Sequence, residues 1–199
     1  MLGYFGPAGT FTHQALQTFT GEEAIPYDTV GQALDAVRTG AVEAALVPIE
    51  NSVEGGVTVT LDNLAKGHRR LMIVREVILP VQFTLFARPG TALGDVRRVL
   101  THPHAAAQVR EWLAANLPLA TVTEGGSTAA ASQEVSDPAS KYDAAVSAEV
   151  AGKMYGLTAL ATGIADNPNA VTRFVLVSKP APPPPPTGAD KTTLVAYMH

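Results

Sequence analysis

One pattern recurs along the chain and constrains its fold most. A short apolar run leads into a loop rich in Gly, Ser, Thr, Asn or Pro, and then into a segment with helical periodicity. Strands that alternate with helices are typical of α/β proteins with largely parallel strands. The sequence therefore predicts an α/β protein with mostly parallel sheets and flanking helices. The apolar runs lie at residues 2–5, 44–49, 96–100, 120–123 and 144–147.

The order of these segments also predicts two lobes. A long β-rich stretch interrupts the alternation at residues 71–87, and a late strand at 172–177 resembles the early ones. A chain that leaves one lobe near residue 80, builds a second lobe and returns near residue 170 makes two crossovers and a cleft. We expect one lobe over residues 1–78 plus 170–178 and the other over residues 79–169.

The last twenty residues read differently. Residues 180–186 are Pro-Ala-Pro-Pro-Pro-Pro-Pro, which is typical of a semi-rigid polyproline II spacer. We expect a linker over residues 179–190. Residues 191–199 begin like a strand and then stop, so we expect them to be the start of a truncated further domain.

Composition narrows the classes of function. Hydrophobic residues make up 46% and charged residues 16%, which excludes a disordered chain. Fourteen Lys and Arg against 18 Asp and Glu give a net charge of −4, so nucleic acid is not an expected partner. There is no Cys, and the His residues show no metal-ligand spacing with nearby acids, so no metal site is expected. No signal peptide and no apolar run of membrane-spanning length is found, so we expect no membrane partner and a cytoplasmic location.

The loops after the strands point to a ligand site. In a parallel sheet they gather at one edge, where the following helices direct free N–H groups and their positive dipole ends. Gly-rich and hydroxyl-rich loops of this kind suit a small dianion. The sequence has neither a GxGxxG motif nor a P-loop lysine, which disfavours a nucleotide. We expect the active site in the cleft between the lobes.

Six segments, in order, resemble the motifs of the prephenate dehydratase family. Together they span nearly all of residues 3–178. Residues 191–195, KTTLV, also resemble the start of the regulatory ACT domain that commonly follows in this family. The six segments are 6–15 (GPAGTFTHQA), 47–57 (VPIENSVEGGV), 101–108 (THPHAAAQ), 127–129 (STA), 144–157 (AAVSAEVAGKMYGL) and 169–174 (NAVTRF).

The resemblance implies a lyase with a two-lobed fold like that of periplasmic binding proteins. Prephenate would lose water and carbon dioxide to give phenylpyruvate, a step in phenylalanine biosynthesis. Restoring an aromatic ring drives this reaction, so no cofactor is expected. The family also implies a homodimer or higher homo-oligomer, with phenylalanine as an effector only if the ACT domain were complete.

The resemblance also implies roles for individual residues. Thr172 matches the catalytic threonine and would donate a hydrogen bond or a proton to the departing hydroxyl. Glu50 is the alternative acid, or else it orients its loop, and Asn51 offers an amide to the hydroxyl or the keto group. Arg173 would grip a substrate carboxylate, or pair with a structural acid while supporting Thr172. The other expected substrate-binding residues are Thr10, Ser52, Thr101, Gln108, Ser127, Thr128 and Phe174.

Two alternatives stay open at this point. Arogenate dehydratases share these motifs and act on a substrate with an amino group in place of the keto group. A non-catalytic two-lobed protein that binds a small anion would use the same cleft and helix ends. Three positions depart from the family pattern: His104 stands where Gln is common, Thr101 where Ser is common, and Ala130 where an acidic residue is often found.

Overall fold

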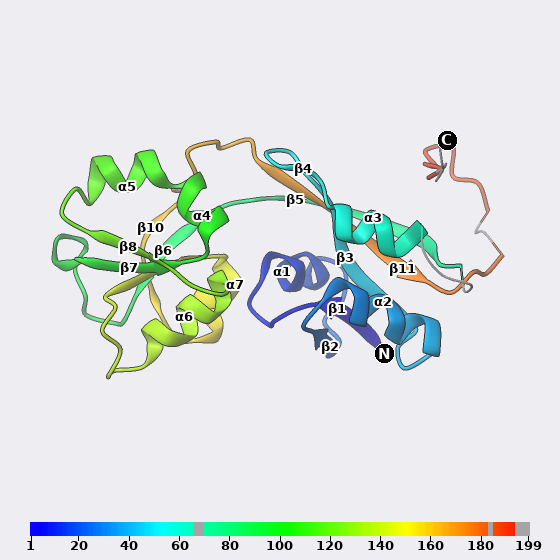
Figure 1. Cartoon of the computed structure of the whole chain (residues 1–199), viewed down its shortest axis with the longest axis horizontal. Coiled ribbons are helices and arrows are strands. Elements are labelled where there is room, and N and C mark those ends of the chain that lie inside the picture. Colours follow the sequence, from blue (N-terminus) through cyan, green and yellow to red (C-terminus); the bar gives the residue numbers. More distant parts are fainter. Residues whose placement is uncertain (66–69, 183–184, 194–199) are drawn as a thin grey trace.

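The chain folds around two β-sheets, one in each lobe (Figure 1). The structure is a computed structural model that describes residues 1–65, 70–182 and 185–193. In this part of the chain, the first sheet has the order β2 (Ala24–Tyr27), β1 (Leu2–Phe5), β3 (Ala44–Asn51), β11 (Val171–Ser178) and β5 (Met72–Pro80), with β4 (Gly55–Gly56) paired to β3. The second sheet has the order β10 (Thr158–Thr162), β6 (Thr84–Ala87), β9 (Ala144–Ser147), β7 (Arg98–Thr101) and β8 (Thr121–Glu124).

Helices cover both sheets. The first lobe, defined here as the first sheet with α1 to α3, contains α1 (Phe11–Gln17), α2 (Val30–Thr39) and α3 (Thr58–Ala65). The second lobe, the second sheet with α4 to α7, contains α4 (Pro103–Gln108), α5 (Arg110–Asn116), α6 (Thr128–Ser136) and α7 (Glu149–Met154), with a short 3-10 turn at Leu93–Asp95.

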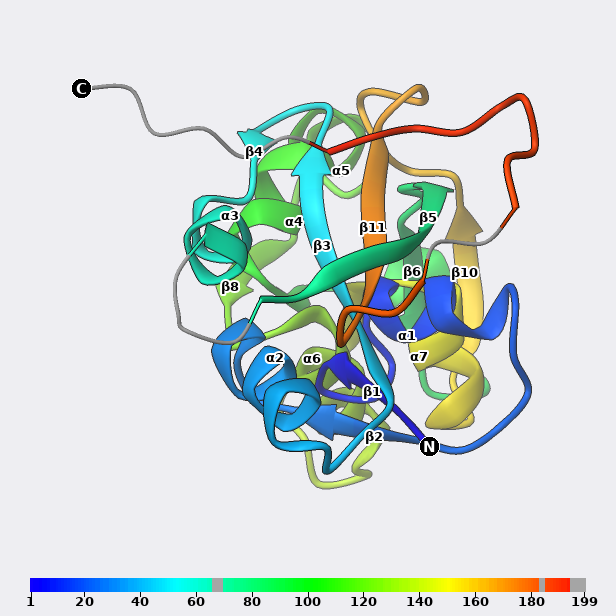
Figure 2. The same cartoon turned by 90° about the vertical axis from the view of Figure 1, so that its right-hand side faces the viewer.

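The first sheet has a core on each face. Successive residues of a strand point to opposite faces, so β11 sends Phe174 into the core that packs with α1 and Val175 into the core that packs with α2. Figure 2 shows α2 and α3 on the side of β3 away from α1. Neighbouring residues of β11 therefore belong to different sides of the lobe.

Both sheets are mixed, which differs from the expectation of mostly parallel sheets. The β1–β2, β1–β3, β7–β8 and β7–β9 pairs are parallel, whereas β11 runs antiparallel to both β3 and β5, and β6 runs antiparallel to β9 and β10. The reason is the crossover. The chain leaves the first lobe at the end of β5 and returns at the start of β11, so these two strands must run in opposite directions.

The two crossing segments are tied together at the junction of the lobes. Val171 is opposite Pro80 in the β11–β5 register. The backbone N–H of Val81 also donates to the carbonyl of Ala170 at 2.8 Å. Figure 1 shows this double connection between the two lobes.

Side-chain packing also joins the lobes. Phe11 of α1 meets Phe83 edge-to-face, with ring centroids 5.3 Å apart. The loop before α1 approaches the second lobe so closely that a Cβ at Gly9 would lie 3.2 Å from the Ala129 Cβ, and the φ of Gly9 is +86°. Glycine at this position meets both requirements, because it has no Cβ and adopts positive φ without strain.

The end of the chain forms no helix or strand over residues 185–193. Residues 194–199, which make up most of the expected ACT strand, lie outside the described residues. Across the described ranges, none of the helices has both the length and the apolar character needed to cross a bilayer.

Two helical glycines give a matched test of the packing. In a helix, Gly→Ala usually stabilises by about 0.5–1 kcal/mol. We expect Gly152→Ala in α7 to destabilise the protein by about 1–3 kcal/mol instead, because the new Cβ would lie 2.1 Å from the ring of Phe86. Urea unfolding followed by circular dichroism measures the effect.

Gly31→Ala in α2 is the control, since its Cβ would have no neighbour closer than 3.6 Å. It should leave the stability unchanged or raise it slightly. Equal effects of the two substitutions would contradict the packing of Phe86 against α7.

Candidate active site

A pocket of about 400 Å³ lies between the lobes. The first lobe contributes the β1–α1 loop, the end of β3 and the start of β11, while the second contributes the starts of α4 and α6. Seven of the residues expected from the sequence line it, namely Thr10, Asn51, Gln108, Ser127, Thr128, Thr172 and Phe174.

Asn51 and Thr172 form the polar centre of this pocket. They are opposite each other in the β3–β11 register, and the Asn51 Nδ2 donates to the Thr172 Oγ1 at 3.1 Å. The Asn51 Oδ1 accepts from the backbone N–H groups of Val53 and Glu54, at 2.8 and 3.3 Å, which fixes the orientation of the amide. Because the Thr172 oxygen accepts from Asn51, its hydroxyl hydrogen is available to donate to a ligand. Thr172 is buried.

Two hydroxyl residues of the pocket also cap helices. Thr10 precedes α1, where its Oγ1 accepts from His13 N at 3.4 Å and donates to the carbonyl of Pro7 at 2.9 Å. Ser127 precedes α6, and its Oγ accepts from Ala130 N at 3.0 Å. The Ser127 hydroxyl hydrogen and the positive end of the α6 dipole favour a negatively charged group here.

Aromatic rings from both lobes form the apolar part of the pocket. Phe5, Phe11, Phe83 and Phe174 line it together with Val81. Phe83 and Phe174 are nearly fully buried. This wall suits a flat or weakly polar ring, while the Asn51–Thr172 pair suits a hydroxyl on it.

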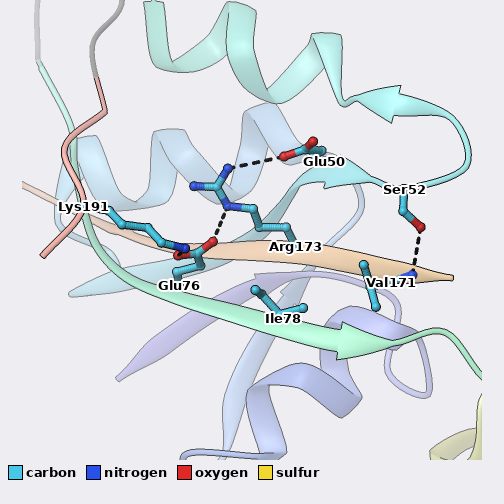
Figure 3. Close-up of a pocket in the computed structure, with 7 residues that line it drawn as sticks. All are labelled: Glu50, Ser52, Glu76, Ile78, Val171, Arg173 and Lys191. Atoms are coloured by element: carbon cyan, nitrogen blue, oxygen red, sulfur yellow. Dashed lines mark hydrogen bonds and ion pairs between the residues drawn. The ribbon is translucent and has the colours of Figure 1, made fainter. Parts of the chain in front are cut away.

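Glu50, Ser52 and Arg173 lie elsewhere. They line a second pocket, of about 420 Å³ (Figure 3). The cause is strand alternation: Arg173 follows Thr172 directly and Glu50 precedes Asn51, so each points to the opposite face from its neighbour. The structure therefore does not bring the expected acid and the expected guanidinium together with the Thr172 hydroxyl.

The charged groups of this second pocket pair with one another. Arg173 Nη1 contacts Glu50 Oε2 at 3.3 Å, and Arg173 Nε contacts Glu76. Lys191, from the segment after the Pro-rich run, reaches Glu76 Oε2 at 2.5 Å. The hydrogen bond from Lys191 holds the pKa of Glu76 below its usual value, and the charges of Arg173 and Lys191 act in the same direction.

Ser52 joins two chain segments through its backbone and side chain. Its N–H donates to the Val171 carbonyl and its Oγ accepts from the Val171 N–H, both at 2.9 Å. These bonds hold the end of β3 against the start of β11. They therefore support the register in which Asn51 meets Thr172.

Thr101 does not line the pocket either. It is fully buried, and its Oγ1 donates to the Val146 carbonyl of the neighbouring strand at 2.7 Å. This hydroxyl thus connects β7 to β9 inside the second lobe.

Several lining residues were not expected from the sequence. Asp28, Glu54, His102 and His104 bring ionisable groups to the pocket. The pKa of His102 is lowered, first by burial and then by the charge of His104. The third motif offered a sequence signal for the two His residues, because they flank Pro103. Asp28 and Glu54 come from loops that no local sequence pattern connects to this motif.

The described residues include no group of three or more His, Asp or Glu side chains that could hold a metal ion.

Fold and site together define a two-lobed α/β protein with a ligand pocket at the lobe junction. The family model for prephenate dehydratase matches residues 2–182. The chain belongs to the prephenate dehydratase family.

Individual proteins are similar to most of the chain. A prephenate dehydratase of Amycolatopsis methanolica is 52% identical over 198 residues, which cover 98% of this chain and 64% of that protein. The chain therefore spans less than two thirds of that relative's length. The structure of an Arthrobacter aurescens prephenate dehydratase in complex with L-Phe matches with a TM-score of 0.88 and 47% identity, over 94% of this chain and 62% of that one. A protein described as a quorum quenching acylase matches with a TM-score of 0.79 and 31% identity, over 93% and 66%.

The ion pairs of Glu76 with Arg173 and Lys191 can be tested by changing the pH. A carboxylate whose pKa is lowered by folding stabilises the protein above its unfolded pKa, and this contribution is lost as the pH falls through the folded pKa. We expect Glu76→Gln to lower the free energy of unfolding near neutral pH by about 0.5–1 kcal/mol. The difference from the unchanged protein should shrink as the pH falls below 4.5, the usual value for this group.

Chemical denaturation at several pH values measures this difference. Glu23→Gln, at an exposed position, controls for the change in net charge. A difference that stays constant down to acid pH would contradict the ion-pair origin of the effect.

Proposed function

We propose that this chain catalyses the conversion of prephenate to phenylpyruvate, water and carbon dioxide. One observation carries the proposal: the Asn51–Thr172 hydrogen bond leaves a donor hydroxyl in a pocket shared by both lobes. Membership of the prephenate dehydratase family supports the same reaction.

The reaction requires few chemical groups from the protein. The bond between the ring and its carboxylate breaks, and its electron pair enters the ring as carbon dioxide leaves. The ring C–O bond breaks at the same time, and the departing oxygen keeps that electron pair and takes a proton to become water. The pocket must therefore hold the ring and stabilise the departing oxygen.

Thr172 is the residue we assign to the departing oxygen. An alkyl hydroxyl is a poor acid near neutral pH, so full proton transfer from it is unfavourable. A hydrogen bond from the buried hydroxyl, oriented by Asn51, instead stabilises the negative charge that develops on this oxygen. The proton that completes the water molecule then comes from solvent.

Other residues would hold the substrate. The rings of Phe11 and Phe83 contact the cyclohexadiene, and the start of α6 at Ser127 and Thr128 receives a carboxylate. Glu50 and Arg173 support the site from the opposite face of the same strands, through their ion pair. Thr10, Gln108 and Phe174 complete the proposed contacts with substrate.

Assembly and regulation are proposals at the level of the family. We propose a homodimer, and phenylalanine as an effector only in a chain with a complete ACT domain. The Arthrobacter aurescens relative, which is longer than this chain, has L-Phe bound in its structure.

Replacing the Thr172 side chain tests the reaction. We expect the unmodified protein to form phenylpyruvate, and Thr172→Ala to lower kcat by about 10²–10³-fold, the effect typical of losing one donor to a developing oxyanion. Thr172→Ser keeps the hydroxyl and should retain most of the activity. Ultraviolet absorbance of phenylpyruvate measures turnover, and circular dichroism checks that both variants fold.

Several results would contradict the proposal. Thr172→Ala with unchanged turnover would remove this residue from its role. Conversion of arogenate in place of prephenate would assign the chain to the arogenate dehydratases. Tight binding of prephenate without any product would favour a binding protein.

A further inference from the structure

The pocket between the lobes has an unusual charge balance for a site that takes a dianion. Among the described residues that line it there is neither Lys nor Arg. The acids Asp28 and Glu54 do line it, and His102 and His104 are the lining side chains that can become positive. Arg173, the cation expected to grip a carboxylate, faces the other pocket instead.

His104 is placed to offset one of these acids. It lies in the first turn of α4 in the second lobe, and its Nδ1 is 3.0 Å from the Glu54 Oε1 of the first lobe. Both side chains are exposed while lining the pocket, so the pair lies at its mouth. Glu54 is also joined to the proposed catalytic pair, because its backbone N–H donates to the Asn51 Oδ1.

Other ionisable groups lie near His104. His102, whose ring is 5.0 Å from that of His104, has its pKa lowered chiefly by burial, which disfavours its charged form. Glu124 at the end of β8 and Glu54 both act on His102 in the opposite direction, and Asp28 lines the same pocket. Of these groups, His104 is the one in direct contact with Glu54.

We propose that His104, held against Glu54, cancels the negative charge of that carboxylate and so lets the pocket capture its dianionic substrate, and that binding weakens when this imidazole is not protonated. The proposal rests on the proposed function for the identity of the substrate. When His104 is protonated, the pair is neutral. When it is not, Glu54 presents an uncompensated negative charge that repels a dianion.

The same charge count predicts a different result for each variant. His104→Gln removes the partner of Glu54, so binding should be weak and should not change with pH between about pH 6 and pH 8. Glu54→Gln removes the repulsion, so binding at pH 8 should be tighter than in the unmodified pocket. The expected effects are about three- to tenfold, as for one charge at a solvated site.

Calorimetry of prephenate binding is the experiment. It uses Thr172→Ala as the background, so that substrate is not consumed, and compares this protein with versions that also carry His104→Gln or Glu54→Gln. Glu149→Gln is the control for net charge, since Glu149 pairs with Lys153 on the surface of α7 and does not line the pocket. We expect binding to weaken about three- to tenfold from pH 6 to pH 8 in the background and the control, and this change to disappear with His104→Gln.

The outcomes separate the two proposals. A pH dependence that survives His104→Gln, or that is absent from the background, would overturn the role of His104. If either of these results is found and the unmodified chain still forms phenylpyruvate, the proposed function stands. Binding with the expected pH dependence but without any product would support His104 and overturn the proposed function, and no binding at either pH would overturn both.

Discussion

The antiparallel register between β3 and β11 is the constraint on which the site depends. It sets Asn51 opposite Thr172 and Glu50 opposite Arg173. Since side chains alternate along a strand, the first pair faces the pocket and the second faces away from it. A shift of one residue would exchange these faces and remove the hydroxyl from the pocket. The two hydrogen bonds between Ser52 and Val171 hold this register at the end of β3 and the start of β11.

The same strand also unites the lobes. β11 lies between β3 and β5, and it begins where the chain returns from the second lobe. The catalytic pair we propose is therefore adjacent to the junction, within reach of residues from both lobes. From Thr172 the hydrogen bonds continue through Asn51 to the loop that carries Glu54, which meets His104 across the pocket. Chemistry and substrate capture are in this way connected through one short chain of contacts.

Much of this arrangement can be predicted from the sequence, and the limits have physical causes. The strand–loop–helix pattern predicts the α/β class, and the resemblance of the motifs to the family implies that Asn51 and Thr172 share a site. Side chains alternate between the two faces of a strand, and this rule alone predicts that Arg173 and Thr172 point to opposite faces. Thr101 is different, because the direction of its hydroxyl depends on the neighbouring strand β9, which comes more than forty residues later.

Two further features depend on how distant parts of the chain meet. The antiparallel strands follow from the crossover between the lobes. A pattern of apolar residues indicates where a strand lies, but it does not give the direction in which that strand runs. The contact of His104 with Glu54 depends on the approach of the two lobes, and nothing local to either segment predicts it.

The coupling between Asn51 and Thr172 tests the central claim most directly. It is measured as a double-mutant cycle on kcat/KM for prephenate, with Asn51→Ala, Thr172→Ala and the two combined. If the amide acts by orienting and polarising the hydroxyl, the combined variant should be no slower than Thr172→Ala alone. The coupling energy then equals the whole effect of Asn51→Ala, about 1.4 kcal/mol if that variant loses tenfold in kcat/KM. Effects that simply multiply would mean that the two side chains act independently, and would contradict the account.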